Sequence, residues 1–157
     1  MSLLKAKYCL ALGCVLAICS VFAIVNSAHA ESNIQGSASF ENFDLHYSLF
    51  PSTFLLPEVA AAYKIKRSEY ETLINVSISR SGEYGGVEGD ISGTVTNLMQ
   101  QQKRLEFIEI KEETAVYYIA PIRISGEELI HFKLTAKVKS NGDVLTTKFS
   151  QKLYQAR

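Results

Sequence analysis

The chain has 157 residues, and its 16 basic and 16 acidic side chains give a formal net charge of zero at neutral pH. No block of like charge and no basic stripe stands out along the sequence, which argues against a nucleic-acid partner. The pattern also lacks a basic amphipathic helix, the usual element of proteins that lie on a membrane surface.

The first 30 residues follow the plan of a secretory signal peptide. Lys5 and Lys7 give a positive start, residues 8–25 are uncharged and mostly apolar, and Ala28-His29-Ala30 supplies the small side chains that signal peptidase reads. We therefore expect cleavage after Ala30 and a periplasmic mature chain without a membrane span. An uncleaved membrane anchor and a lipoprotein attached through a cysteine are the alternatives.

The three cysteines of the chain, Cys9, Cys14 and Cys19, all lie in this leader. The expected mature chain therefore has no thiol, which excludes disulfides, thiolate nucleophiles and sulfur-ligated metals. Removing 30 of 157 residues leaves 127. A chain of that length forms one domain that a hydrophobic core can hold without a covalent staple.

Residues 31–40 are small and polar, and we expect them to form a flexible lead-in to a single domain over residues 41–157. From Phe43 to Leu49 apolar and polar residues alternate, which predicts a half-buried strand. Pro51 removes a backbone donor and should end its pairing. Pro57 followed by an acidic residue predicts a short helix that runs to Tyr63, directly after the first strand.

The rest of the sequence reads as short strands with turn signals between them. The clearest of these strands runs from Leu129 to Lys139, and Asn141-Gly142 after it is a strong hairpin signal. The pattern predicts an all-β protein, an antiparallel immunoglobulin-like β-sandwich of about seven strands with one short helix after the first strand. The other predicted strands cover residues 73–79, 87–97, 105–110, 115–122 and 145–153.

The segment from Phe50 to Arg67 does not fit this regular pattern, because its loop is apolar where loops are usually polar. A loop of this kind either caps the end of the sandwich or faces a partner. Cations after the short helix could form the rim of a docking site or complement the helix dipole. The candidate binding residues are Phe54, Leu55, Lys64, Lys66 and Arg67.

A second candidate site is a metal centre. Asp44 and His46 are two residues apart on a predicted strand and therefore share one face, and His131 is the other histidine of the mature chain. Two ligands are fewer than the three or four that a metal site normally has, and solvent-facing strand residues give the same pattern.

The motifs of common enzymes are missing. No serine lies in a glycine-flanked elbow, and the glycines from Gly82 to Gly93 lack the lysine and following helix of a phosphate-binding loop. We therefore expect no catalytic residue, no enzymatic activity and no cofactor.

A set of short motifs covers most of the mature chain. The densest lie at residues 46–47, 50–55, 57–60 and 63–68, with weaker ones at residues 92–98, 106–112 and 117–120. On these residues the chain resembles an exported bacterial family described as a domain of unknown function, DUF4426. The resemblance implies a cell-envelope location and one compact domain, and it brings no known reaction or ligand.

These observations lead to three hypotheses of function. The first is a non-enzymatic binding module that contacts an envelope protein or ligand through the segment from Phe50 to Arg67. The second is a metal-binding envelope protein that uses Asp44, His46 and His131. The third is a structural or stress-related periplasmic factor without a discrete site.

Overall fold

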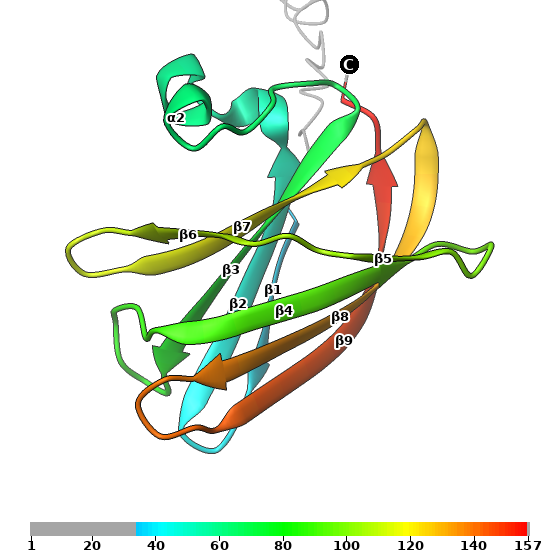
Figure 1. Ribbon diagram of the computed structural model, residues 1–157. Coiled ribbons are helices and arrows are strands. Elements are labelled where there is room, and N and C mark those ends of the chain that lie inside the picture. The colour runs from blue at the N-terminus through cyan, green and yellow to red at the C-terminus, as the bar shows by residue number, and fades with distance from the viewer. Residues whose placement is uncertain (1–33, 157) are drawn as a thin grey trace, which may run out of the picture. The chain divides into compact units, whose positions relative to one another are not determined.

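The computed structural model describes residues 34–156, and the predicted signal peptide lies outside this range (Figure 1). The described part contains nine strands, one 3₁₀ turn and one short α-helix. In chain order these are β1 (Ile34–Ser39), β2 (Phe43–Pro51), η1 (Ser52–Phe54), α2 (Pro57–Ala62), β3 (Glu71–Arg80), β4 (Gly89–Thr96), β5 (Gln102–Arg104), β6 (Ile108–Lys111), β7 (Val116–Arg123), β8 (Glu127–Val138) and β9 (Val144–Tyr154).

The strands form two sheets in which every pair of neighbours is antiparallel. The five-stranded sheet has the order β1-β2-β3-β7-β6, and the four-stranded sheet has the order β5-β4-β8-β9 (Figure 1). Buried side chains from both sheets form one common hydrophobic core. The prediction of an all-β, antiparallel protein is therefore confirmed.

Strict alternation along β8 shows how the sequence builds this core. Ile130, Phe132 and Leu134 are buried. Lys133, which lies between two of them, and Lys137, further along the strand, are exposed. Because successive side chains of a strand point to opposite faces, this register places the apolar set between the sheets and the lysines in solvent. The hairpin predicted at Asn141-Gly142 joins β8 to β9 and keeps the two strands in register along their length.

An aromatic stack joins the sheets near β1 and β9. The Tyr47 ring from β2 stacks on Phe149 from β9 at 3.9 Å between centroids, and Phe149 stacks on Phe132 at 4.6 Å. The Tyr47 ring also lies directly against Gly36 of β1, where a Cβ atom would overlap the phenol. Glycine is therefore required at this position of the edge strand because the ring occupies the space of a side chain.

Three details of the predicted fold are wrong. Residues 34–39 of the expected flexible lead-in form strand β1, whose small side chains carry little hydrophobic signal although its backbone pairs with β2. The strand count is nine rather than about seven, because β1 and the three-residue, fully exposed β5 lack the apolar alternation used to find strands. As a result the helix follows the second strand and not the first.

The predicted helix is otherwise confirmed, since α2 begins at Pro57 and ends at Ala62, one residue before the predicted end. It is too short and not apolar enough to cross a membrane, and no other α-helix occurs in residues 34–156.

Candidate binding surfaces

The segment that follows β2 packs on the outer face of the five-stranded sheet. A second, smaller cluster of apolar side chains lies there, outside the common core. Leu55 and Tyr63 pack against this cluster, and Ile65 belongs to it with only 8% of its surface exposed. The strand residues of the cluster are Leu73, Ile110 and Ile119.

Polar contacts fix the two ends of the segment to each other. The Ser52 side chain is fully buried, and its Oγ accepts the Ser68 N–H at 2.9 Å and donates to the Ser68 carbonyl at 3.0 Å. The Arg67 guanidinium donates to the Thr53 carbonyl at 2.8 Å. The loop is therefore closed by three hydrogen bonds between positions about 15 residues apart in the chain.

The end of α2 is fixed as well, by a Schellman motif. The Ile65 N–H donates to the Ala60 carbonyl at 2.8 Å, and the Lys64 N–H donates to the Ala61 carbonyl at 3.2 Å. Lys64 adopts a φ of 56°, the left-handed conformation that this motif requires. Ile65 and Ala60 are both buried, as is usual for the apolar contact that accompanies the motif.

The fixed segment divides the predicted binding residues into two groups. Leu55 and Arg67 hold the segment itself, through the outer cluster and the Thr53 carbonyl, and the Arg67 side chain is also exposed. Phe54, Lys64 and Lys66 are exposed, Phe54 with 46% of its surface. Leu56, which the sequence did not single out from its neighbours, is 60% exposed.

The residues of the candidate metal site do not come together as a set of three. Asp44 and His46 share the outer face of β2 and line an open hollow of about 460 Å³. His131 lies on β8 of the other sheet, facing away from the core. Each histidine has a cross-strand serine partner: His46 Nε2 lies 2.9 Å from Ser79 Oγ, and His131 Nδ1 lies 2.6 Å from Ser150 Oγ.

Across residues 34–156, no group of three or more histidine, cysteine, aspartate or glutamate side chains is arranged to hold a metal ion. The arrangement that the fold does provide is one histidine and one carboxylate on the same strand face, beside hydroxyl groups.

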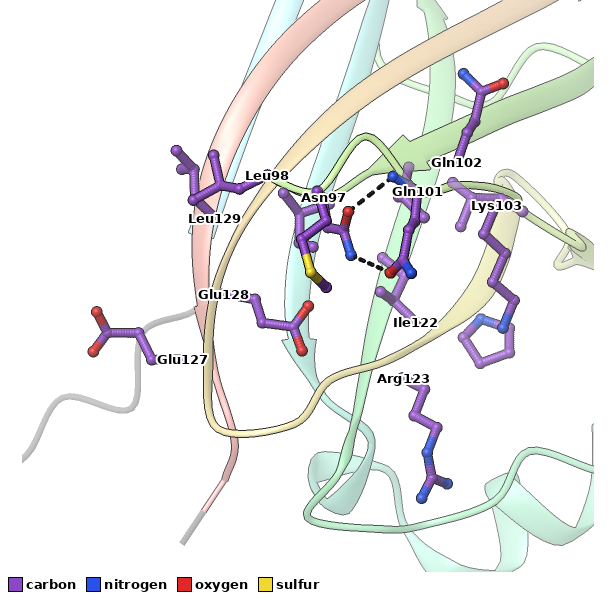
Figure 2. Close-up of a pocket in the computed structure, with 15 residues that line it drawn as sticks. Asn97, Leu98, Gln101, Gln102, Lys103, Ile122, Arg123, Glu127, Glu128 and Leu129 are labelled. Atoms are coloured by element: carbon purple, nitrogen blue, oxygen red, sulfur yellow. Dashed lines mark hydrogen bonds between the residues drawn. The ribbon is translucent and has the colours of Figure 1, made fainter.

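A larger hollow, which the sequence interpretation missed, lies at the turn between β4 and β5 (Figure 2). It has a volume of about 660 Å³ and continues down to buried residues of the common core. Leu98 and Met99, at the tip of the turn, are 66% and 74% exposed. The sequence does contain a signal for this site, because an apolar pair inside the polar turn Asn97–Gln101 is as unusual as the apolar loop at Phe54.

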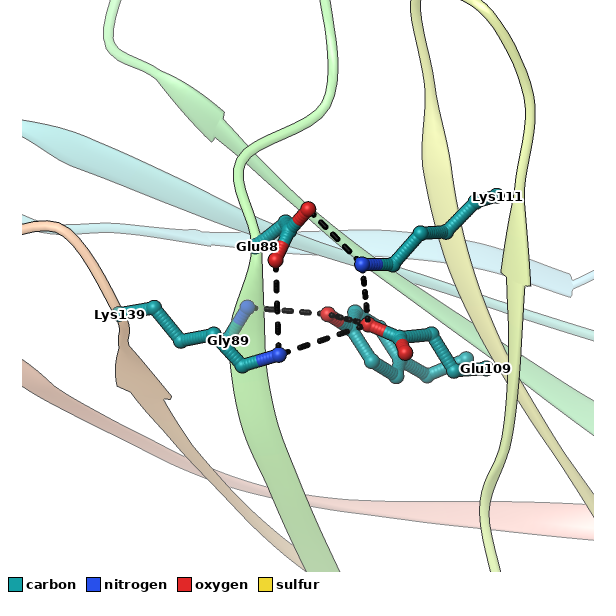
Figure 3. A network of polar contacts seen from close by, with 6 residues as sticks. Glu88, Gly89, Glu109, Lys111 and Lys139 are labelled. Atoms are coloured by element: carbon teal, nitrogen blue, oxygen red, sulfur yellow. Dashed lines mark hydrogen bonds and ion pairs between the residues drawn. The ribbon is translucent and has the colours of Figure 1, made fainter.

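A network of charged side chains lies where β4 and β8 of one sheet approach β6 and β7 of the other (Figure 3). Lys111 lies 2.9 Å from Glu88 and 3.7 Å from Glu109, and Lys139 lies 3.5 Å from Glu88 and 3.7 Å from Glu109. The Tyr118 hydroxyl accepts the Gly89 N–H at 2.9 Å and donates to Glu109 at 3.2 Å. Glu88 and Glu109 therefore both have cationic partners within the protein. These ion pairs connect the two sheets.

The ion pairs shift the acid–base equilibria of this network. The hydrogen bond from Lys111 is the main cause that lowers the pKa of Glu88, and the same bond raises the pKa of Lys111. The charge of Glu109 raises the pKa of Lys139. Burial of the phenol raises the pKa of Tyr118.

Comparisons with known proteins place this architecture in a family. A family model described as "Domain of unknown function (DUF4426)" matches residues 37–156. The chain is also similar to the crystal structure of a DUF4426 family protein from Pseudomonas aeruginosa PAO1, with a TM-score of 0.71 and 30% sequence identity. That match covers 78% of this chain and 97% of the other. Among curated proteins, no match was found.

Two structures of FetP from uropathogenic Escherichia coli strain F11 share the fold at 12% identity. One is a copper-bound variant, with a TM-score of 0.56 and coverage of 80% of this chain and 93% of FetP. The other is the protein as isolated, with a TM-score of 0.50 and coverage of 80% and 97%. At this identity the likeness concerns the fold alone.

Proposed function

The chain belongs to the DUF4426 family, and we propose that it is an exported, non-enzymatic binding module of the cell envelope. Its contact surface is the exposed side of the segment from Phe50 to Arg67. The leader pattern of residues 1–30 supports export to the periplasm.

The observation that carries the proposal is the exposure of Phe54 and Leu56 on a backbone that is fixed on both sides. Hydrogen bonds of Ser52 and Arg67 close the loop, and the Schellman motif ends the helix. Exposed apolar side chains that lie next to each other on the surface mark interaction sites when they form a contiguous patch. A surface that is already ordered loses little conformational entropy when it binds.

The charge of the segment indicates the chemistry of the partner. Three cations, Lys64, Lys66 and Arg67, lie in residues 50–67, and Glu58 is the one acidic residue there. We infer that the partner is an envelope protein that presents apolar side chains bordered by carboxylates. Attraction of this kind speeds association and weakens with salt.

We also infer that the two sheets form an immunoglobulin-like β-sandwich. The support is their antiparallel pairing, the single core between them, and a strand count of nine, which equals that of variable-type immunoglobulin domains. In such domains the strands supply a rigid frame and the connecting segments supply the contacts.

Site-specific photocrosslinking in living cells tests the proposed surface. A photoreactive amino acid replaces Leu56 in the full chain, and the control carries it at Val144, an equally exposed apolar residue of β9 with 61% of its surface accessible. We expect one specific adduct from position 56 and none from position 144. Equal adducts from both positions, or none from position 56, would contradict the proposal.

A second candidate function is metal binding at Asp44 and His46. It is supported by their position in one hollow of β2, and a copper-bound structure exists in the distantly similar FetP. Addition of copper or zinc should then raise the melting temperature of the wild type and of His131→Ala but not of His46→Ala. The absence of a shift in the wild type would end this hypothesis.

A further inference from the structure

We propose that the hollow beside Leu98 and Met99 binds an amphipathic carboxylate, a single-chain acid whose head group contacts Lys103 and Arg123. Its apolar chain lies in the hollow. This site is separate from the segment Phe50–Arg67 and does not depend on the function proposed for that segment.

The first argument is the shape and lining of the hollow. Its volume of about 660 Å³ falls in the range typical of small-molecule sites. Its walls include apolar residues that are nearly fully buried in the common core, so an apolar chain that enters from the rim meets an apolar surface. These residues are Val95, Leu105, Ile122 and Ile130.

The second argument is the rigidity of the rim. Asn97 Nδ2 donates to Gln101 Oε1 at 2.8 Å, and the Gln101 N–H donates to Asn97 Oδ1 at 2.9 Å (Figure 2). Backbone bonds from the Asn97 and Gln100 N–H groups close the same turn. The tip therefore holds Leu98 and Met99 in fixed positions at the mouth of the hollow, where a bound apolar chain would shield both from water.

The third argument is the distribution of charge around the rim. Glu127 is paired with Lys152, and Glu128 Oε1 accepts the Ser125 N–H at 3.0 Å. Within residues 34–156, no carboxylate lies within ion-pair distance of Lys103 or Arg123. The acids at the rim therefore already have partners, whereas the two cations are available to an anion.

The positions of these charges also suggest how the ligand is oriented. Lys103 from β5 and Arg123 from β7 lie on one side of the hollow, and Glu127 and Glu128 lie on the other (Figure 2). A carboxylate is attracted to the first side and repelled from the second. The guanidinium fork of Arg123 matches the two oxygens of a carboxylate, which favours an acid over an uncharged head group.

A titration with decanoate, followed by NMR of the methyl groups of the protein purified after export, tests the proposal. We expect shift changes at Leu98, Met99, Ile122 and Ile130. The double variant Lys103→Gln/Arg123→Gln should bind at least about tenfold more weakly because both charged contacts are lost. The matched control Lys137→Gln removes an exposed lysine of β8 away from the hollow and should bind like the wild type.

Decyltrimethylammonium, which has the same chain and the opposite charge, serves as the ligand control. The proposal is overturned if this cation binds as tightly as decanoate, or if the charge variant binds like the wild type. It is also overturned if the shifted methyl groups lie elsewhere, or if decanoate causes no change up to roughly 1 mM. A second variant, Leu98→Ser/Met99→Ser, changes only exposed side chains and should weaken binding without loss of stability.

Discussion

The neighbouring residues Leu55 and Leu56 should respond in opposite ways to the same substitution. Leu55 packs against the outer cluster of the five-stranded sheet, whereas Leu56 is 60% exposed. Replacing a fully buried leucine by alanine costs about 2–5 kcal/mol. Since Leu55 is only partly buried, we expect Leu55→Ala to lower the free energy of unfolding by about 1–2 kcal/mol. Leu56→Ala should change it by less than about 0.5 kcal/mol.

Urea denaturation followed by circular dichroism measures both values, and thermal melting provides a second reading. For a domain of this size, the loss at Leu55 corresponds to a fall of roughly 4–8 °C in the melting temperature. Binding of the partner should show the opposite pattern. Leu56→Ala should weaken binding directly, whereas Leu55→Ala should reduce it only because part of the protein is unfolded. Equal destabilisation by the two variants would refute the assignment of one leucine to packing and the other to contact.

Three further predictions concern the segment, the edge strand and the ion network. Lys64→Gly should stabilise the protein by about 0.5–1 kcal/mol, because glycine adopts the left-handed conformation of residue 64 without strain. Gly36→Ala should destabilise it by about 1–3 kcal/mol, because the new methyl group overlaps Tyr47, whose ring is held against Phe149. Stability should fall at acidic pH as Glu88 is protonated, and Glu88→Gln should remove part of this acid dependence.

The direction of the pH effect follows from the pKa shifts. The pKa of Glu88 is lowered in the folded state, so its contribution is present above the ordinary glutamate value of 4.5 and is lost as the pH falls through the folded value. The pKa values of Lys111 and Lys139 are raised, so their contributions are complete below the ordinary lysine value of 10.5 and are lost as the pH rises through the folded values. Between these limits the contribution of this network to the denaturation midpoint should be constant.

Each of these predictions has a clear contrary outcome. A loss of stability in Lys64→Gly would mean that the lysine side chain contributes more than the backbone strain costs. Wild-type stability in Gly36→Ala would show that the Tyr47 ring can move, and the double variant Gly36→Ala/Tyr47→Leu should otherwise recover much of the loss. An acid transition that is identical in Glu88→Gln and the wild type would assign the pH dependence to other groups.

The sequence predicts most of the core because its signal is periodic. In β8, the alternation of Ile130, Phe132 and Leu134 with polar residues identifies both the strand and its buried face, and the structure agrees. In β1, the inward residues are Ile34, Gly36 and Ala38, so the strand has one large apolar side chain and its hydrophobic pattern is too weak to identify it. Strands of this kind depend on a neighbour that is distant in sequence, which local periodicity cannot reveal.

The sequence locates the candidate binding segment, but it does not show which of its residues pack on the sheet and which are exposed. The apolar loop at residues 54–56 is visible as an exception, yet three adjacent apolar residues give no sign of which one packs. The answer depends on the turn at η1 and on the bond between Ser52 and Ser68, which are set by tertiary contacts. The hollow beside Leu98 requires residues from β4, β5, β7 and β8 together, so it exists only in the folded chain.

The most direct test of the binding function is the affinity of the crosslinked partner for three forms of the protein. These are the wild type, the surface variant Phe54→Ser/Leu56→Ser, and the control Val144→Ser. Isothermal titration should show at least about tenfold weaker binding for the surface variant, because two apolar side chains of the contact are lost, and an unchanged dissociation constant for the control. Wild-type affinity in a correctly folded surface variant would contradict the account.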